Sequence, residues 1–581
     1  MQREELIDLL TRLQAGLGEM QVVEAKRAKT EVPSDLPETL SAFSNTSEGG
    51  VIVLGIDESS GFALTGVDNV ERASSRVAQL CRDELEPSIS PLISSEEVEG
   101  RRLVVIEVPE LVPSDKPCYI KSRGISNGAF LRIGGTNRKL TAYESTVLYA
   151  NRTQPVDEVK PAVGATQADL DPKLVESLIT RVRERRGPAF QTIDNETVLK
   201  RLGVVTPGGE VTLAGLLALG RYPQQFYPQL DITFAFYARA DREPTPDGTR
   251  FLDSASIDGP MPVMVAEAMQ RIRRNMRYRA VIQGGGRVDM PDYPEEALRE
   301  ALSNALMHRD YSGLAQGTQV RVEMFPDRIE IESPGGLYGP VSTEALQTGD
   351  VVSSSRNAVL AKLLEDVGGV DGHAIAENRG SGIPTMQRTL REAHLAPPEF
   401  DDQVSRFTVR VRNATLVDEE TLDWIASTGQ KGLSERQVAG LALARRGATL
   451  TNARYRALAG CDASLATREL ADLRDRGLLT KSATAGHRVA WRLSPAFRPL
   501  SSAQADAELP GRLTAEIRRQ QIRRLLELGD RSTRQLADAT GLGKQSVRNY
   551  LNDLREAGEV EPTSERIKSP ATRWRLVGSG R

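Results

Sequence analysis

The chain has 581 residues, of which 39% are hydrophobic and 27% are charged, with a formal net charge of −4. This length exceeds what one hydrophobic core supports, so we expect several domains of an ordinary globular protein. The three cysteines lie far apart without CxxC spacing, and no apolar run reaches 18 residues. These features argue against a disulfide framework, a zinc ribbon, secretion and a membrane span, and they favour a cytoplasmic protein.

Residues 1–150 predict a domain of short strands and turns. The segments GGVIVLGIDESSG and RRLVVIEVPE are rich in β-branched residues and are bounded by Gly, Pro or charge, which is typical of buried strands. Carboxylates that converge can hold a divalent metal and cut phosphodiesters, and Glu19, Glu24 and Asp57 are candidates for catalysis and metal binding. Glu24 could equally pair with Lys26 or Arg27 in a surface network, so both interpretations stay open.

Geometry limits the first of these interpretations. Five residues apart on an ideal strand, Glu19 and Glu24 would point to opposite faces. Glu19 must therefore lie in the Gly16–Gly18 turn if the three carboxylates are to meet. Four cationic side chains nearby suit contacts with nucleic-acid phosphates: Lys26, Arg132, Arg138 and Lys139.

A connector follows at residues 165–250. The stretch EVKPAVGATQADLDP is rich in Pro and Ala and has little periodicity, so we expect a linker there. Mostly helical sequence continues to about Gly220, and QLDITFAFYAR predicts a strand. No residue in the connector indicates chemistry.

The segment YPEEALREALSNALMHRDYS predicts an amphipathic helix that begins at Asp292 or Pro294. Glu300 and Asn304 share one face of this helix because they are four residues apart. A carboxylate beside a carboxamide oxygen suits hydrated Mg²⁺, and the carboxylate could also polarise a water. Solvated surface residues are the alternative interpretation.

The sequence that follows adds elements of a phosphate site. GTQVRVEMFPDRIEIESPGG predicts two alternating strands that break at Pro326-Asp327, and SSSRN comes next. Gly380 and Gly382 then open a helical pattern, where free backbone N–H groups and the helix dipole suit phosphate.

In this order the motifs resemble the GHKL-type ATPase domain, in its RecG-like branch, from about Ser254 to Phe400. The resemblance rests on six motifs: Glu300 with Asn304, His308-Arg309-Asp310-Tyr311-Ser312, Asp327-Arg328-Ile329-Glu330-Ile331, Ser333-Pro334-Gly335, Ser355-Arg356-Asn357 and Gly380-x-Gly382-Ile383. It implies ATP and Mg²⁺ as cofactors, with Mg²⁺ on Asn304 and Glu300 as the general base of a weak ATPase. It also implies nucleotide contacts from Ser333, Gly335, Gly336, Arg356, Gly380 and Gly382.

One position departs from the GHKL pattern. Ser333 stands where GHKL proteins have an aspartate that binds the adenine amino group. A hydroxyl binds that group less strongly than a carboxylate. The resemblance therefore implies nucleotide binding and leaves both hydrolysis and adenine selectivity open.

The N-terminal domain resembles the AlbA-type Schlafen-like domain over roughly residues 15–145. The matching elements are Glu19-x4-Glu24-x-Lys26, Ala42-Phe43-Ser44-Asn45-Thr46, Gly49-Gly50, Gly55-Ile56-Asp57, Gly61 and Gly66. The resemblance implies a nucleic-acid-binding domain. Ribonuclease members of the Schlafen group hold metal with two glutamates and an aspartate, which implies a metal role for Glu19, Glu24 and Asp57.

Residues 430–497 and 510–581 each predict two short helices around a turn, followed by a β-wing. Both blocks resemble the winged helices of bacterial regulators. Between Gly511 and Arg581 there are fifteen Lys and Arg against nine Asp and Glu, about +6, which favours DNA for the second block. A solvated basic surface and protein contacts by the winged helices are the alternative interpretations. Side chains that suit base edges in a major groove lie on the second helix of each block: Thr467, Arg468, Lys544, Gln545, Arg548 and Asn549.

We therefore expect an α/β multidomain (α+β) protein: a Schlafen-like α+β domain at 1–150, the connector, a GHKL-type α/β sandwich at 251–412, and two winged-helix domains. The expected function is an ATP-binding, DNA-binding cytoplasmic regulator of transcription, with RNA as a possible ligand and a homo-oligomer as the expected assembly. The alternative is a metal-dependent nuclease, perhaps defensive, gated by the ATPase domain. A third interpretation is an inactive ATPase scaffold, whereas a helicase lacks support because no GxxxxGK[ST] loop exists.

Overall fold

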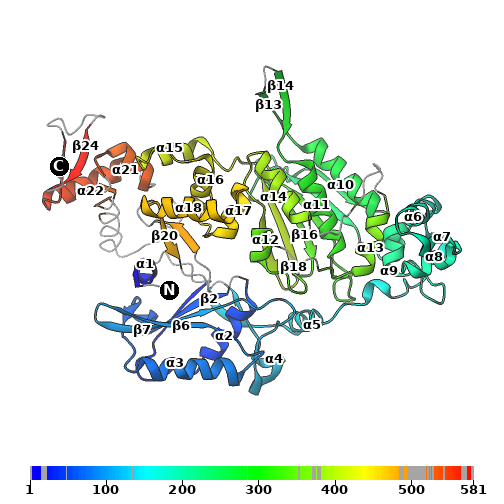
Figure 1. Ribbon diagram of the computed structural model, residues 1–581, viewed down its shortest axis with the longest axis horizontal. Coiled ribbons are helices and arrows are strands. Elements are labelled where there is room, and N and C mark those ends of the chain that lie inside the picture. The colour runs from blue at the N-terminus through cyan, green and yellow to red at the C-terminus, as the bar shows by residue number, and fades with distance from the viewer. Residues whose placement is uncertain are drawn as a thin grey trace.

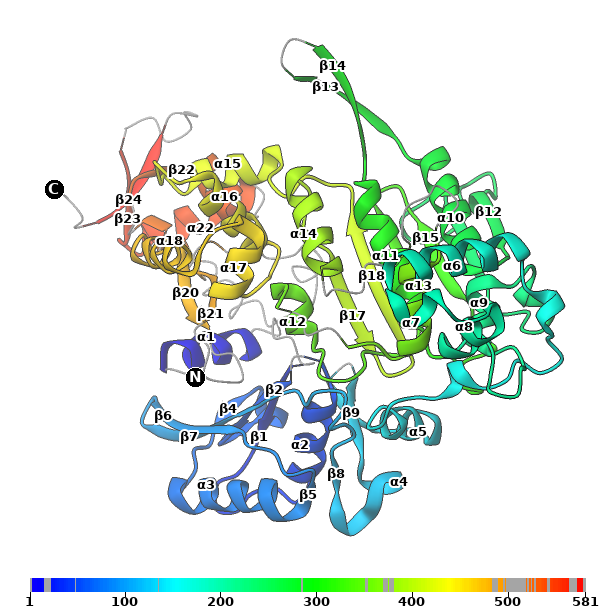
Figure 2. The same ribbon diagram turned by 45° about the vertical axis from the view of Figure 1, so that its right-hand side comes forward.

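The structure is a computed structural model. It describes residues 3–14, 22–47, 49–133, 135–283, 286–350, 354–368, 375, 381–482, 490–494, 497, 519, 522–523, 525–526, 529–540, 544–563 and 572–577. Figures 1 and 2 show an N-terminal part in blue, a central part from cyan to green and a C-terminal part from yellow to red. Helices and sheets mix along the whole chain, as expected of an α+β multidomain protein.

The N-terminal part is built on a four-stranded sheet of order β1-β2-β7-β6. Its strands are β1 (Val23–Lys26), β2 (Gly50–Leu54), β7 (Arg101–Val108) and β6 (Leu92–Val98), and only β1 and β2 run parallel among these pairs. Helices α2 (Leu36–Asn45) and α3 (Val70–Gln79) cover one face, and α1 (Arg3–Gln14) covers the other. The continuous apolar runs of β2 and β7 follow from this burial on both faces.

Smaller elements complete the N-terminal part. Between β2 and the β6–β7 pair the chain forms β3 (Ile56–Asp57), η1 (Glu58–Ser60) and β4 (Ala63–Leu64), then η2 (Leu80–Glu84) and β5 (Leu85–Glu86). After that pair come β8 (Tyr119–Ile120), η3 (Lys121–Arg123), α4 (Gly124–Gly128), β9 (Phe130–Ile133), β10 (Thr136–Lys139) and α5 (Ala142–Ala150). Asn45 ties α2 to these later elements, since its amide bonds the backbone of Cys118 and Phe130.

The central part contains one continuous core that extends from Ala162 to Val411. The connector supplies η4 (Asp157–Val159), η5 (Gln167–Asp169), α6 (Pro172–Arg185), α7 (Pro188–Gln191), α8 (Asn195–Arg201), α9 (Leu213–Leu219) and η6 (Pro223–Gln225). The stretch expected as a linker is instead packed, with Glu158, Ala162 and Leu170 each at most 4% exposed. Buried backbone and apolar contacts at these positions hold the connector against the central sheet.

That sheet has six strands in the order β12-β11-β15-β16-β18-β17. Its strands are β11 (Ile232–Tyr237), β12 (Phe251–Ile257), β15 (Val320–Met324), β16 (Arg328–Pro334), β17 (Glu399–Gln403) and β18 (Arg406–Arg412). Helices α10 (Met261–Asn275), α11 (Glu295–Met307) and α14 (Gly382–Glu392) lie over one face (Figure 2). The opposite face holds ion pairs such as those of Glu330 with Arg328 and Arg410, so the sheet forms a two-layer sandwich.

Three further features surround this sandwich. The β13 (Tyr278–Gln283) and β14 (Gly286–Pro291) hairpin extends away from the body (Figure 1). Helix α12 (Thr343–Thr348) lies between β16 and α13 (Ala358–Asp366) in the chain. Gln387 of α14 donates to the carbonyls of Leu346 and Gln347 in α12, which holds these two helices together.

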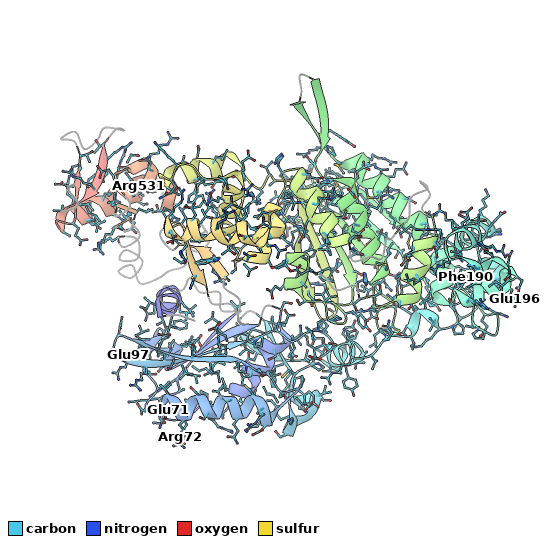
Figure 3. All side chains as sticks on the ribbon, viewed as in Figure 1. Glu71, Arg72, Glu97, Phe190, Glu196 and Arg531 are labelled. Atoms are coloured by element: carbon cyan, nitrogen blue, oxygen red, sulfur yellow. The ribbon has the colours of Figure 1, made fainter. Side chains whose placement is uncertain are left out.

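The C-terminal part contains two three-stranded sheets, each in the order first, last, middle: β19-β21-β20 and β22-β24-β23. The first block comprises α15 (Glu419–Ser427), α16 (Glu435–Arg445), β19 (Leu450–Thr451), α17 (Asn452–Ala459), α18 (Ala463–Asp475), β20 (Leu479–Ser482) and β21 (Ala490–Leu493). The second comprises β22 (Arg531–Ser532), α21 (Thr533–Thr540), α22 (Lys544–Glu556), β23 (Val560–Pro562) and β24 (Arg573–Leu576). Arg531, labelled in Figure 3, joins the blocks because it donates to the carbonyls of Ser427 and Thr428.

Candidate functional site

Glu300 and Asn304 lie on the face of α11 that meets α14. The amide Nδ2 of Asn304 donates to Oε1 of Glu300 at 3.0 Å, and both side chains are partly exposed. The other face of α11 is a buried stripe of Ala and Leu: Ala297, Leu298, Ala301, Leu302 and Ala305. The amphipathic pattern therefore places both polar side chains on the partly exposed face of this helix.

The start of α14 lies directly against the Glu300 carboxylate. A Cβ atom on Gly382 would stand 1.7 Å from Oε1 of Glu300 and 2.5 Å from its Cδ. No side chain fits at this position while Glu300 keeps its place. The first turn of a helix has free backbone N–H groups and a positive dipole end, so this corner attracts anions. Gly380 lies outside the described residues.

The end of β16 is fixed to α11. The hydroxyl of Ser333, 5% exposed, donates to the carbonyl of Ala305 at 2.6 Å, so it bonds helix backbone. The N–H of Asp310 donates to the carbonyl of Pro334 at 2.8 Å. Arg309 is 1% exposed and bonds the carbonyls of Ala315 and Thr318, which gives it a structural role in the turn after α11.

The next two residues form a close-packed loop. Gly335 has a φ of 92°, a conformation that L side chains rarely adopt, and a Cβ there would lie 2.1 Å from Nη1 of Arg356. A Cβ on Gly336 would lie 2.5 Å from the carbonyl oxygen of Gln403. Arg356 is 2% exposed and donates from Nη2 to the carbonyl of Gly336 at 2.8 Å. A side chain at either position would clash with these atoms, so both residues must be glycine.

Three titratable groups beside this loop have shifted pKa values. Burial lowers the pKa of His308 to about 4, and the charge of Arg356 adds to the effect, so His308 is neutral at pH 7. Burial also lowers the pKa of Arg356, while the carboxylates of Asp310 and Asp402 oppose the shift. Burial raises the pKa of Asp402 to about 6, against the opposing effects of Lys116 and the Leu337 N–H. The loop thus lies in a poorly hydrated, charged environment.

The residues at the α11–α14 corner fit a nucleotide with its magnesium ion. The amide of Asn304 turns its Nδ2 toward Glu300, so its Oδ1 points away from that carboxylate oxygen. An amide oxygen beside a carboxylate is a hard oxygen pair of the kind that Mg²⁺ binds. The free backbone N–H groups at the start of α14 suit the phosphates that would accompany the ion, and Gly382 allows Glu300 to lie against that helix end.

The N-terminal carboxylates lie in a second place. Glu24 and Asp57 line one open hollow together with Lys26, Arg27 and Asp35. Oε2 of Glu24 lies 2.5 Å from Nη2 of Arg132, and Oε1 lies 3.0 Å from Nζ of Lys26. Glu24 is therefore neutralised by two cations, which agrees with the ion-pair interpretation and leaves a metal role unsupported by this geometry.

The remaining groups of that hollow are also occupied. Asp57 accepts bonds from the N–H and hydroxyl of Ser59, and these hydrogen bonds lower its pKa. No three His, Cys, Asp or Glu side chains gather as metal ligands anywhere in the described ranges. Glu19 lies outside the described residues, so its place in the hollow stays a prediction.

Of the expected phosphate contacts in this part, Arg132 is the least accessible. Its side chain is 1% exposed and also bonds Asn137 and the carbonyl of Val23. Arg138 pairs with Glu144 at 2.6 Å, whereas Lys139 is exposed. Lys26 bonds both Glu24 and Asp35.

The polar helix faces of the C-terminal blocks are exposed as expected. Thr467 and Arg468 lie on the outer face of α18, and Arg548 and Asn549 lie on that of α22. The side chains of Lys544 and Gln545 lie outside the described residues. On the inner face of α18, Glu469 bonds Ser434, Arg436 and Tyr455. This structural network was not predicted from the sequence.

Two family models match the chain. Residues 19–141 match the model described as Schlafen, AlbA_2. Residues 317–411 match the HATPase model described as "Putative ATP-dependent DNA helicase recG C-terminal", which covers the strands of the central sheet from β15 to β18 and the Ser333–Gly336 loop. Both matches confirm the resemblances that the motifs indicated.

Two solved structures are also similar. The DIP2311 protein from Corynebacterium diphtheriae is 17% identical, with 99% of this chain and 100% of that chain covered and a TM-score of 0.36. The N-terminal domain of a RecG-related protein from Nitrosomonas europaea is 31% identical, with 24% of this chain and 95% of that chain covered and a TM-score of 0.20. A search of curated proteins found no match.

No described helix combines the length and the apolar character needed to cross a membrane. The Schlafen, AlbA_2 match includes the hollow around Glu24, and the HATPase match includes strands of the central sheet. The chain is therefore a protein that joins a Schlafen AlbA_2-type domain to a RecG-like C-terminal HATPase domain.

Proposed function

We propose that this chain is a cytoplasmic regulator that binds ATP with Mg²⁺ and whose nucleotide state controls its binding to DNA. The observation that supports the nucleotide site best is the contact of the Glu300 carboxylate, bonded to Asn304, with the first residue of α14. The match of residues 317–411 to an ATPase-type model agrees with it.

Within this site each residue has a distinct role. Asn304 would hold Mg²⁺ through Oδ1, and the start of α14 at Gly382 would face the phosphates. Gly335 and Gly336 allow their loop to pack closely against Arg356 and Gln403 at the edge of the site. A bound Mg²⁺ would supply charge neutralisation on the phosphate oxygens.

Glu300 is placed to accept a proton from a water near the phosphates. Its Oε1 already bonds Asn304, which holds the carboxylate in one orientation. Ser333 presents no carboxylate, and its hydroxyl is engaged with Ala305. We therefore propose slow hydrolysis at most, consistent with a switch rather than a motor.

The DNA-binding modules of this proposal are the two C-terminal blocks. The helix and strand order of the first block supports a winged helix, and the second block repeats its strand order and its last two helices, with an exposed polar helix, α18 or α22, available to a major groove in each. Arg468 and Arg548 are the side chains best suited to guanine or phosphate contacts. Two recognition helices per chain gain from repeated half-sites, so we propose a homo-oligomer on DNA.

A second candidate is a metal-dependent nuclease, because Glu24 and Asp57 share one hollow with Lys26. The ion pairs of Glu24 with Arg132 and Lys26 weigh against it, since a metal would have to displace two cations.

The test combines both candidates in one set of assays. Labelled DNA and RNA are incubated with the full chain, Mg²⁺ or Mn²⁺, and ATP present or absent, and both retention and cleavage are measured. Retention of DNA that depends on ATP, without cleavage, supports the regulator. Cleavage that Glu24→Gln abolishes and Glu97→Gln preserves would establish the nuclease, since Glu97 is an exposed residue of β6 outside the hollow (Figure 3).

A further inference from the structure

The loop after β16 contacts the N-terminal part directly. The N–H of Ser114 donates to the carbonyl of Gly339 at 3.3 Å, and the hydroxyl of Tyr338 donates to Oε1 of Gln154 at 3.1 Å. The hydroxyl of Ser47 donates to the carbonyl of Asp402 at 3.2 Å. The loop before β8 and the segment after α5 therefore meet the loop after β16, and the residues that follow α2 meet the neighbouring strand β17.

Arg356 lies at the centre of this contact. Its Nη2 donates both to the carbonyl of Gly336 at 2.8 Å and to Oδ1 of Asn151 at 3.3 Å. In return, Nε2 of Gln154 donates to the carbonyl of Arg356 at 2.6 Å. One buried guanidinium thus bonds the glycine loop on one side and the segment that follows α5 on the other.

The bonding of Arg356 is incomplete. Its Nε and Nη1 are buried and have no hydrogen-bond partner among the described residues, and the residue is 2% exposed. A buried donor left without a partner is unfavourable by about 1–3 kcal/mol, and by more when the group is charged. Any shift of the loop that brings an acceptor to Nε or Nη1 would remove this unfavourable term and stabilise the protein. The group is therefore suited to two alternative positions.

We propose that Arg356 couples the nucleotide site to the N-terminal Schlafen-type domain. A ligand at the Gly335–Gly336 loop moves that loop, Arg356 follows the Gly336 carbonyl, and the bonds to Asn151 and Gln154 pass the change to α5. This inference rests on the proposed nucleotide site and adds which nucleic-acid module responds to it and through which contacts.

The coupling can be measured in the full chain by amide hydrogen exchange, with ADP and Mg²⁺ as the probe. The variants Gln154→Ala and Asn151→Ala remove partners of Arg356 on the N-terminal side only. Gln167→Ala is the matched control, because its amide bonds Gly209 within the connector and reaches no other part. Thermal unfolding of each variant verifies that it folds, and calorimetry gives its ADP affinity.

In the wild type we expect ADP to slow exchange at residues 142–154 by about fivefold or more, the lower range of allosteric couplings. The two variants should keep ADP affinity within about threefold of the wild type, which is under 1 kcal/mol, and lose the change at 142–154. Gln167→Ala should behave as the wild type does.

Two results would overturn the inference alone. One is ADP binding by the wild type without any change at residues 142–154. The other is an unchanged response in Gln154→Ala and Asn151→Ala. Failure of the wild type to bind ADP would refute the proposed nucleotide site itself, and the inference with it, so calorimetry on the wild type separates the two failures.

Discussion

The contact between α11 and α14 makes Gly382→Ala the most informative substitution in the candidate site. The new Cβ would lie 1.7 Å from Oε1 of Glu300, and real Cβ contacts almost never fall below 3.0 Å. The carboxylate must therefore move by more than 1 Å, which breaks the 3.0 Å bond from Asn304. A hydrogen bond to a charged group contributes about 1.5–3 kcal/mol, and partial exposure of Glu300 favours the lower value.

Replacing Gly by Ala also restricts the unfolded chain, which stabilises a protein by about 0.4–1 kcal/mol where the backbone allows it. The net loss in unfolding free energy should then be about 1 kcal/mol. Because the carboxylate and the start of α14 would both shift, nucleotide affinity should fall by at least about tenfold, or 1.4 kcal/mol. Urea denaturation and calorimetric titration with ATP and Mg²⁺ measure the two effects.

Two further variants test the cause of these losses. Gly317→Ala adds the same methyl group where no atom of the described residues lies within 4 Å, and it should be neutral or slightly stabilising. In a Glu300→Ala background, Gly382→Ala should no longer destabilise, because the carboxylate that it displaces is absent. If Gly382→Ala behaved like Gly317→Ala, or if its effect were the same in both backgrounds, the proposed contact would be incorrect.

Three other substitutions have defined outcomes. Burial raises the pKa of Asp402 from 3.8 to about 6, so the folded state loses stability as pH rises from about 4 through 6, where the buried carboxyl ionises; Asp402→Asn should gain up to about 3 kcal/mol over the wild type at pH 7.5 and little at about pH 3.5 in urea denaturation. Glu158→Ala should lower the free energy of unfolding by about 2–3 kcal/mol, because it leaves two N–H groups at the start of α13 unpaired. Asp157→Ala removes only a surface ion pair and should lower it by under about 1 kcal/mol. Equal losses in the two variants would contradict this assignment. Arg468→Ala and Arg548→Ala should each weaken DNA binding by about 1–3 kcal/mol in fluorescence anisotropy, and unchanged affinity in both would exclude α18 and α22 as the DNA contacts.

Local patterns predicted the elements of the candidate site. The break at Pro326-Asp327 separates β15 from β16, and α11 begins one residue after Pro294. The alternating Ala and Leu of α11 fixed which face would hold Glu300 and Asn304. Each of these features depends on residues within a few positions of one another, and periodicity reports such neighbours directly.

Contacts between distant segments could not be predicted from these local patterns. Glu24 and Arg132 are 108 residues apart, and their pairing depends on how β9 returns to the N-terminal sheet. The burial of Arg309, in one of the motifs that carry the GHKL resemblance, follows from the turn after α11. Asn151 reaches Arg356 across 205 residues. Nothing in local composition distinguishes such buried, structural arginines from exposed ligand-binding ones.

The central claim is that α11 and α14 form a magnesium-dependent nucleotide site. The most direct test is calorimetric titration of ATP into the full chain and into Asn304→Ala, each with and without Mg²⁺. The account predicts that Mg²⁺ strengthens binding to the wild type and that Asn304→Ala loses this dependence while remaining folded. Absence of ATP binding by the wild type, or an equal Mg²⁺ dependence in both proteins, would contradict it.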